Sequence, residues 1–110
     1  MTKAIINKQT ITSLELLGQI NFFREKEGKK TELQHYDLLK IIRSEFDEEI
    51  HKGKISCMFR DVKIGNGATR KEPYYILSLS QGKQVLTRES KFVRRAVIHK
   101  LEELESEQPK

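Results

Sequence analysis

Basic side chains gather at three places in this 110-residue chain, whose formal net charge is +5. Lys29 and Lys30 precede a predicted helix, where they could hold a phosphate group beside the helix N-terminus. Lys63, Arg70 and Lys71 flank a segment that contains two glycines. The third cluster consists of Arg88, Lys91, Arg94 and Arg95. Several cationic clusters are typical of proteins that neutralise a phosphate backbone, so nucleic-acid binding is the first chemistry to consider.

The charges are also segregated along the chain. Residues 1–43 carry 8 basic and 5 acidic side chains and residues 60–95 carry 9 and 3, whereas residues 44–59 and 96–110 each carry 2 and 4. A nucleic-acid partner should therefore meet the first and third segments. Other interpretations stay open. Loop lysines improve solubility, charged residues protect an edge strand, and the third cluster could pair with acidic residues 45–49.

Catalytic and metal-binding patterns are absent from the sequence. The single cysteine, Cys57, cannot form an intramolecular disulfide, and with His35, His51 and His99 it does not complete a zinc site at the usual spacing. Cys57 is interpreted as a small buried residue of a strand, and His35 as a packed or capping histidine. We therefore expect no catalytic residue, no metal ligand, no cofactor and no enzymatic activity.

Two helices are predicted in the first half of the chain. Thr12 and Glu15 have the spacing of a capping box, and the apolar residues that follow predict a helix from about Ser13 to Phe23 or slightly beyond, then a solvated turn over 24–30. Thr31 and Gln34 repeat the capping spacing and predict a second helix that ends near residues 49–50. Its predicted core-facing side chains are His35, Leu38, Leu39, Ile42 and Phe46, and its predicted outward side chains are Leu33, Tyr36, Asp37, Lys40 and Ser44.

The periodicity changes to that of strands after residue 54. Residues 55–64 and 74–79 are rich in β-branched and aromatic residues, and the segment 65–73 between them predicts a hairpin with a long basic tip. Pro73 is expected at the start of its strand, and Tyr74 and Tyr75 on opposite strand faces. Ser78 or Ser80 should cap a third helix to about Thr87.

Ser90 should cap a fourth helix that ends near Ser106. The apolar stripe of this helix is predicted to consist of Phe92, Val93, Ala96, Val97, Leu101 and Leu104. The order of helix, helix, hairpin, helix and helix predicts one α+β domain over residues 1–110, with residues 1–10 and 107–110 frayed. Two helices followed by a hairpin suggest a winged helix-turn-helix arrangement.

Four short segments resemble the phage regulatory protein Rha family when taken in order. They are Ser13-Leu-Glu-Leu-Leu17, His35-Tyr-Asp-Leu-Leu-Lys-Ile-Ile-Arg43, Glu72-Pro-Tyr-Tyr-Ile-Leu-Ser78, and Arg94-Arg-Ala96 together with Leu101-Glu-Glu-Leu-Glu105. One departure is that residues 21–34 separate Ile20 from His35, where the family has a compact Gly-Lys-Arg-His step. The resemblance implies a bacteriophage or prophage regulator that binds DNA through a winged-helix-like domain.

These observations combine into one functional expectation. The second helix would enter the major groove of double-stranded DNA and the basic hairpin would act as a wing along the backbone. The candidate DNA-binding residues are Lys29, Lys30, Gln34, Tyr36, Lys40, Lys63, Arg70, Lys71, Lys91 and Arg94.

An alternative function is an antirepressor-like module that binds a host or phage regulator protein instead of DNA. In either case the last helix could pair two copies into a homodimer. Without an apolar run of about 20 residues or a disulfide framework, we expect a cytoplasmic protein of a bacterial host with no membrane partner.

Overall fold

Strand β1 (Thr10–Thr12) leads directly into helix α1 (Ser13–Glu27) in the computed structural model, which describes residues 10–28 and 31–106. The predicted capping box is confirmed: Oγ1 of Thr12 accepts from the Glu15 N–H at 3.0 Å, and Oε1 of Glu15 accepts from the Thr12 N–H at 2.9 Å. The expected turn at residues 24–27 is wrong, because α1 continues to Gly28, which ends it with a positive φ of 98°. Fraying of Thr10 is also wrong, since this residue pairs with Ser78.

Helix α2 (His35–Glu45) is shorter than the predicted second helix at both ends. Gln34 precedes it without a side-chain cap, so the predicted Thr31–Gln34 capping box does not form. Instead, α1 holds the extended connector 31–34: Asn21 bonds the Leu33 backbone at 2.8 and 3.1 Å, and Arg24 donates to the Thr31 carbonyl at 3.2 Å. Leu33 consequently packs against the core and does not point outward.

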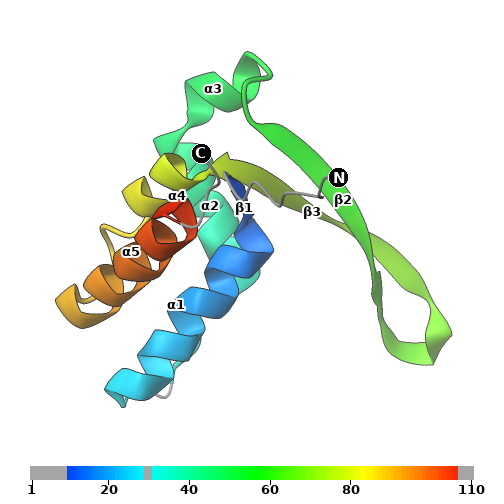
Figure 1. Cartoon of the computed structure of the whole chain (residues 1–110). Coiled ribbons are helices and arrows are strands. Elements are labelled where there is room, and N and C mark those ends of the chain that lie inside the picture. The colour runs from blue at the N-terminus through cyan, green and yellow to red at the C-terminus, as the bar shows by residue number, and fades with distance from the viewer. Residues whose placement is uncertain (1–9, 29–30, 107–110) are drawn as a thin grey trace, which may run out of the picture.

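A bend at Phe46 separates α2 from the short helix α3 (Asp47–His51). Phe46 is buried in the bend, with a φ of −123°, which is outside the helical range. The single helix predicted to end near residues 49–50 is therefore two helices, because anchoring Phe46 in the core turns the chain. The acidic residues Asp47, Glu48 and Glu49 make up most of α3, at the opposite end of the hairpin from its tip (Figure 1).

Strands β2 (Ser56–Lys63) and β3 (Thr69–Ser78) form a long hairpin that extends away from the helices (Figure 1). We call residues 56–78 the hairpin arm. Its turn is a short 3₁₀ segment, Gly65–Gly67, so Arg70 and Lys71 lie in a strand and not in a long tip as predicted. Pro73 is inside β3 opposite Phe59, not at its start. A proline is tolerated there because β1 pairs with β3 only from Ile76 onward, which leaves that edge of β3 free.

Most of the arm lies outside the hydrophobic core. The sheet order is β1-β3-β2, and no residue of β2 is buried. Phe59 is 61% exposed, and Cys57, predicted to be buried, is exposed as well. The predicted opposite faces of the two tyrosines are confirmed, since Tyr75 is buried while Tyr74 is half-buried.

Helices α4 (Leu79–Gln84) and α5 (Lys91–Ser106) complete a small α+β domain. Ser78 caps α4 in a capping box with Gln81, and the Ser90 hydroxyl accepts from the Val93 N–H at 3.2 Å, so both expected serine caps are confirmed. α4 ends before the predicted Thr87. The core residues come from β1, α1, α2, β3, α4, α5 and the loops between them: Ile11, Leu16, Ile20, Leu38, Leu39, Ile42, Phe46, Ile55, Tyr75, Leu77, Leu79, Val85, Leu86, Val93, Val97 and Leu101.

An ion pair inside the helical layer joins α1 to the connection between α4 and α5. Nε and Nη2 of Arg24 each donate to a carboxylate oxygen of Glu89 at 2.8 Å, and the two side chains are 16% and 4% exposed. This hydrogen bond raises the pKa of Arg24 above its usual value. The bidentate geometry fixes where α1 ends and where α5 begins, although 65 residues separate the partners in sequence.

Removing one member of this pair should destabilise the fold strongly. Glu89→Ala leaves the Arg24 guanidinium unpaired where little water reaches it, and we expect a loss of about 3 kcal/mol in the free energy of unfolding. The double variant Arg24→Met/Glu89→Leu removes both charges and should lose less than Glu89→Ala alone. Urea denaturation measures these differences. A loss for Glu89→Ala no larger than that of the exposed substitution Lys52→Ala would contradict this account.

Candidate nucleic-acid interface

A groove of about 300 Å³ separates α2 from strand β3 of the hairpin arm. Both walls carry basic side chains: Arg43 comes from α2, and Arg70 and Lys71 come from β3. The full lining is His35, Tyr36, Leu39, Arg43, Arg70, Lys71, Glu72 and Pro73. The fold therefore brings together basic residues from the first and third charge segments, which lie far apart in the sequence.

The exposed face of α2 carries an aromatic and basic stripe along one side of this groove. Tyr36 is 60% exposed, and the Lys40 ammonium lies 5.4 Å from the centre of its ring. Arg43 is one turn further along, donates from Nε to the Tyr75 hydroxyl at 3.0 Å and lies over the Tyr75 ring. Tyr36 and Lys40 are thus exposed as predicted, and the Tyr75 contacts orient Arg43.

Arg43 is the residue of this stripe that sequence reasoning did not select. It follows Tyr36 by seven residues and Lys40 by three, which places all three on one helical face. That spacing is visible in the sequence. The contact that holds Arg43 at the groove comes from Tyr75, 32 positions later, and no local pattern shows it.

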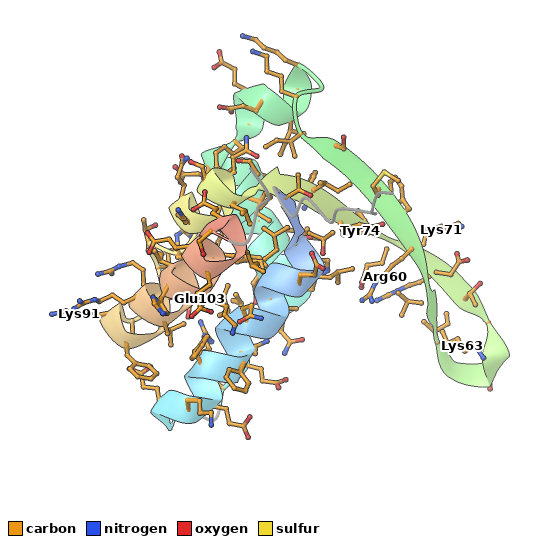
Figure 2. The ribbon with its side chains drawn as sticks, in the orientation of Figure 1. Arg60, Lys63, Lys71, Tyr74, Lys91 and Glu103 are labelled. Carbon is orange, nitrogen blue, oxygen red and sulfur yellow. The ribbon has the colours of Figure 1, made fainter. Side chains whose placement is uncertain are left out.

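Two of the four basic residues of the arm are neutralised across the strands. Lys71 pairs with Asp61 at 2.8 Å, and Arg60 donates to Glu72 at 2.6 and 2.9 Å. Figure 2 shows Arg60 on the side of the arm that faces the helices. Within the described part of the chain, Lys63 and Arg70 have no ion-pair partner. The positive charge available on the arm is therefore carried mainly by these two residues.

Other residues predicted for the interface do not join this groove. Figure 2 shows Lys91 at the opposite side of the molecule from Lys63 and Lys71, and Arg94 lies beside Lys91 on α5. Gln34 is exposed immediately before α2. Lys29 and Lys30 lie outside the described residues.

His35 closes the inner end of the groove, where it contacts both α1 and the arm. Its side chain is 10% exposed, its Nε2 lies 3.0 Å from the Ser13 hydroxyl, and its Nδ1 lies 3.6 Å from Oε1 of Glu72. Burial lowers the pKa of His35 despite the nearby carboxylate. The hydrogen bond from Arg60 lowers the pKa of Glu72, which keeps that carboxylate ionised. His35 is therefore a packed histidine, as the sequence predicted.

No set of three His, Cys, Asp or Glu side chains in residues 10–28 and 31–106 is arranged to hold a metal ion. In the same ranges, no helix combines the length and the apolar character needed to cross a membrane. Comparisons with protein-family models, curated proteins and solved structures yield no significant match.

The buried state of His35 predicts how stability depends on pH. Because its folded pKa lies below the ordinary 6.5, the unfolded chain binds a proton at pH values where the folded chain does not. The free energy of unfolding should therefore fall as the pH is lowered from about 7.5 to about 5.5, before Glu72 titrates. Thermal unfolding across this range should show a smaller decrease for His35→Gln than for the wild type.

His51→Gln serves as the matched control, because His51 is exposed at the end of α3. This variant should keep the pH dependence of the wild type. The assignment to His35 fails if His35→Gln and His51→Gln show the same pH dependence.

Proposed function

We propose that this protein binds double-stranded DNA as a regulator of the phage type, with α2 as the recognition helix and the hairpin arm as the wing of a winged helix-turn-helix. The observation that carries the proposal is the groove between α2 and β3, because its two walls present basic side chains to the same space. A helix in the major groove and a hairpin against the adjacent backbone need this combination of charge and shape.

The exposed stripe of α2 would supply the contacts to base edges and nearby phosphates. Lys40 and Arg43 carry donors that suit phosphate oxygens or guanine edges, and Tyr36 lies next to them near the N-terminal end of the helix. Gln34 is exposed one residue before the helix, where its amide can also reach a base edge. Gln34 and Tyr36 lie at the N-terminal end of α2, the part of a recognition helix that most often contacts bases, while Arg43 is in its last turn.

The acidic residues near the groove present little free negative charge. Arg60 neutralises Glu72 and Lys71 neutralises Asp61, so neither carboxylate presents a free negative charge to a phosphate. Asp37 is half-buried in the first turn of α2, where the helix dipole favours a negative charge. The arm would then contact the phosphate backbone of the DNA mainly through Lys63 and Arg70.

The proposed relation to the Rha-like regulators is supported by where the resembling residues lie. Ser13, His35 and Tyr75 belong to three of the segments that carry the resemblance, and they meet in one hydrogen-bonded cluster. These residues hold α1, α2 and the arm together, so they would preserve the groove in any relative with the same arrangement.

Binding to a labelled duplex should depend steeply on salt. If about five cations of the groove and arm contact phosphates, affinity should fall on the order of 10²–10³-fold between about 50 and 200 mM salt. Lys40→Ala and Arg70→Ala should each reduce the salt slope by about one. Lys52→Ala, immediately after α3, is the matched control and should leave the slope unchanged. Fluorescence anisotropy provides the measurement, and absence of binding at the lowest salt would reject the proposal.

A second candidate function is binding to a host or phage regulator protein. The observation that favours it is the exposure of two apolar side chains on β2, Met58 (45%) and Phe59 (61%), which lie on opposite faces of a strand with one free edge. Exposed apolar side chains on an unpaired strand edge are typical of protein-binding surfaces.

A reporter of prophage promoter activity in a bacterial host can separate the two candidates. Under the protein-binding alternative, Phe59→Ser should abolish regulation. The double variant Arg70→Ala/Lys71→Ala should retain it, because Met58 and Phe59 are unchanged. Under DNA binding, the double variant should lose regulation. Circular dichroism must show that each variant is folded, and the observed pattern then rejects one candidate.

A further inference from the structure

The outward face of α5 has an exposed aromatic residue inside a shallow hollow. Phe92 was predicted to face the core, yet it is 49% exposed, because Val93, Val97 and Leu101 form the buried side of the helix. The hollow has a volume of about 650 Å³ and is lined by Lys91, Phe92, Arg95, Ala96 and His99. These residues recur at the spacing of one helical face, so they form a continuous surface.

The charges along α5 run in the direction that its own dipole disfavours. The first turn contains no acidic residue and the last turn no basic residue. Basic side chains fill the N-terminal half, whereas Glu102, Glu103 and Glu105 lie near the C-terminal end. A helix dipole favours the reverse order, with acidic residues first and basic residues last. The order is therefore not explained by the stability of the isolated helix.

We infer that this face binds a second copy of the chain, with the two α5 helices packed antiparallel in a two-fold symmetric dimer. A symmetric interface requires a surface that is complementary to itself. Antiparallel pairing places the basic half of each helix against the acidic half of the other, and it also opposes the two helix dipoles. Glu105 has an intramolecular partner, Lys83 of α4 at 2.9 Å, and a second copy would place basic side chains against Glu102 and Glu103.

The register of this pairing follows from the sequence of the face. If His99 lies at the two-fold axis, Arg95 is four residues before the axis and Glu103 four residues after it. Arg95 of each copy then lies beside Glu103 of the other. Glu103 already has two polar neighbours within the chain, the His99 imidazole at 3.2 Å and the Lys100 ammonium at 3.5 Å, and Arg95 of the second copy would add a further cation beside it. Phe92 lies further from the axis and would be covered by the C-terminal end of the other helix.

Duplex DNA is a poorer occupant of the same face. A duplex along α5 would meet the carboxylates of Glu102, Glu103 and Glu105 immediately after the basic half. Lys91 also lies on the opposite side of the molecule from Lys63 and Lys71 (Figure 2). A dimer through α5 would leave the α2 groove of both copies open, and the inference holds whether or not the protein binds DNA.

Sedimentation velocity over a range of protein concentrations tests the dimer without any ligand. The wild type should show a concentration-dependent dimer. Phe92→Ser should raise the dimer dissociation constant about thirtyfold, as expected for the loss of a buried aromatic anchor. Lys52→Glu, a charge reversal immediately after α3, is the matched control and should sediment as the wild type does.

Charge reversal tests the antiparallel register. Arg95→Glu and Glu103→Arg should each be monomeric alone, because each creates two repulsive pairs in a symmetric dimer. Mixing these two proteins should restore a dimer, since the mixed pair has two attractive contacts, and the double variant Arg95→Glu/Glu103→Arg should dimerise by itself. Circular dichroism must show a folded chain for each variant.

Three results would overturn the inference. They are a monomeric wild type at all concentrations, a dimer that is indifferent to Phe92→Ser, and single charge variants that stay monomeric when mixed.

Discussion

The buried hydroxyl of Ser13 is the contact on which the arrangement of α1, α2 and the arm depends. It accepts the Tyr75 N–H at 3.0 Å, and it lies 3.0 Å from Nε2 of His35. The other ring nitrogen of His35, Nδ1, lies 3.6 Å from Oε1 of Glu72. One serine therefore links the start of the first helix, the start of the second helix and the middle strand. Replacing it with an apolar residue would leave two buried polar groups without partners.

The base of the arm is held by further contacts. Leu77 lies in the hydrophobic core, β3 pairs with β1 over residues 76–78, and at the groove Glu72 lies against Arg60 and His35. The outer part of the arm has no core to pack against, because β2 contributes no buried residue. An arm that is fixed at its base and exposed along its length can present its tip to a partner surface, which is the property that a wing requires.

The sequence predicted the elements that are set by local chemistry and missed those that depend on distant residues. The capping box of Thr12 and Glu15 formed, but the same spacing at Thr31 and Gln34 did not, because Asn21 and Arg24 already bind the connector backbone. The exposure of Cys57 and Phe59 follows from the position of β2 outside the core, which strand periodicity cannot reveal. The pair of Arg24 and Glu89 and the contact of Arg43 with Tyr75 are also long-range, so neither was predicted.

Charge counting along the sequence predicted a basic hairpin but not which of its charges are free. The strand register decides this, because it places Arg60 opposite Glu72 and Asp61 opposite Lys71. Those four charges cancel in pairs, and Lys63 and Arg70 remain close to the turn. The free positive charge of the arm is therefore concentrated near its tip. On α5 the basic residues are instead followed by carboxylates on the same helix. The arm and groove therefore carry an excess of cations, whereas α5 carries basic residues in its N-terminal half and carboxylates near its C-terminal end.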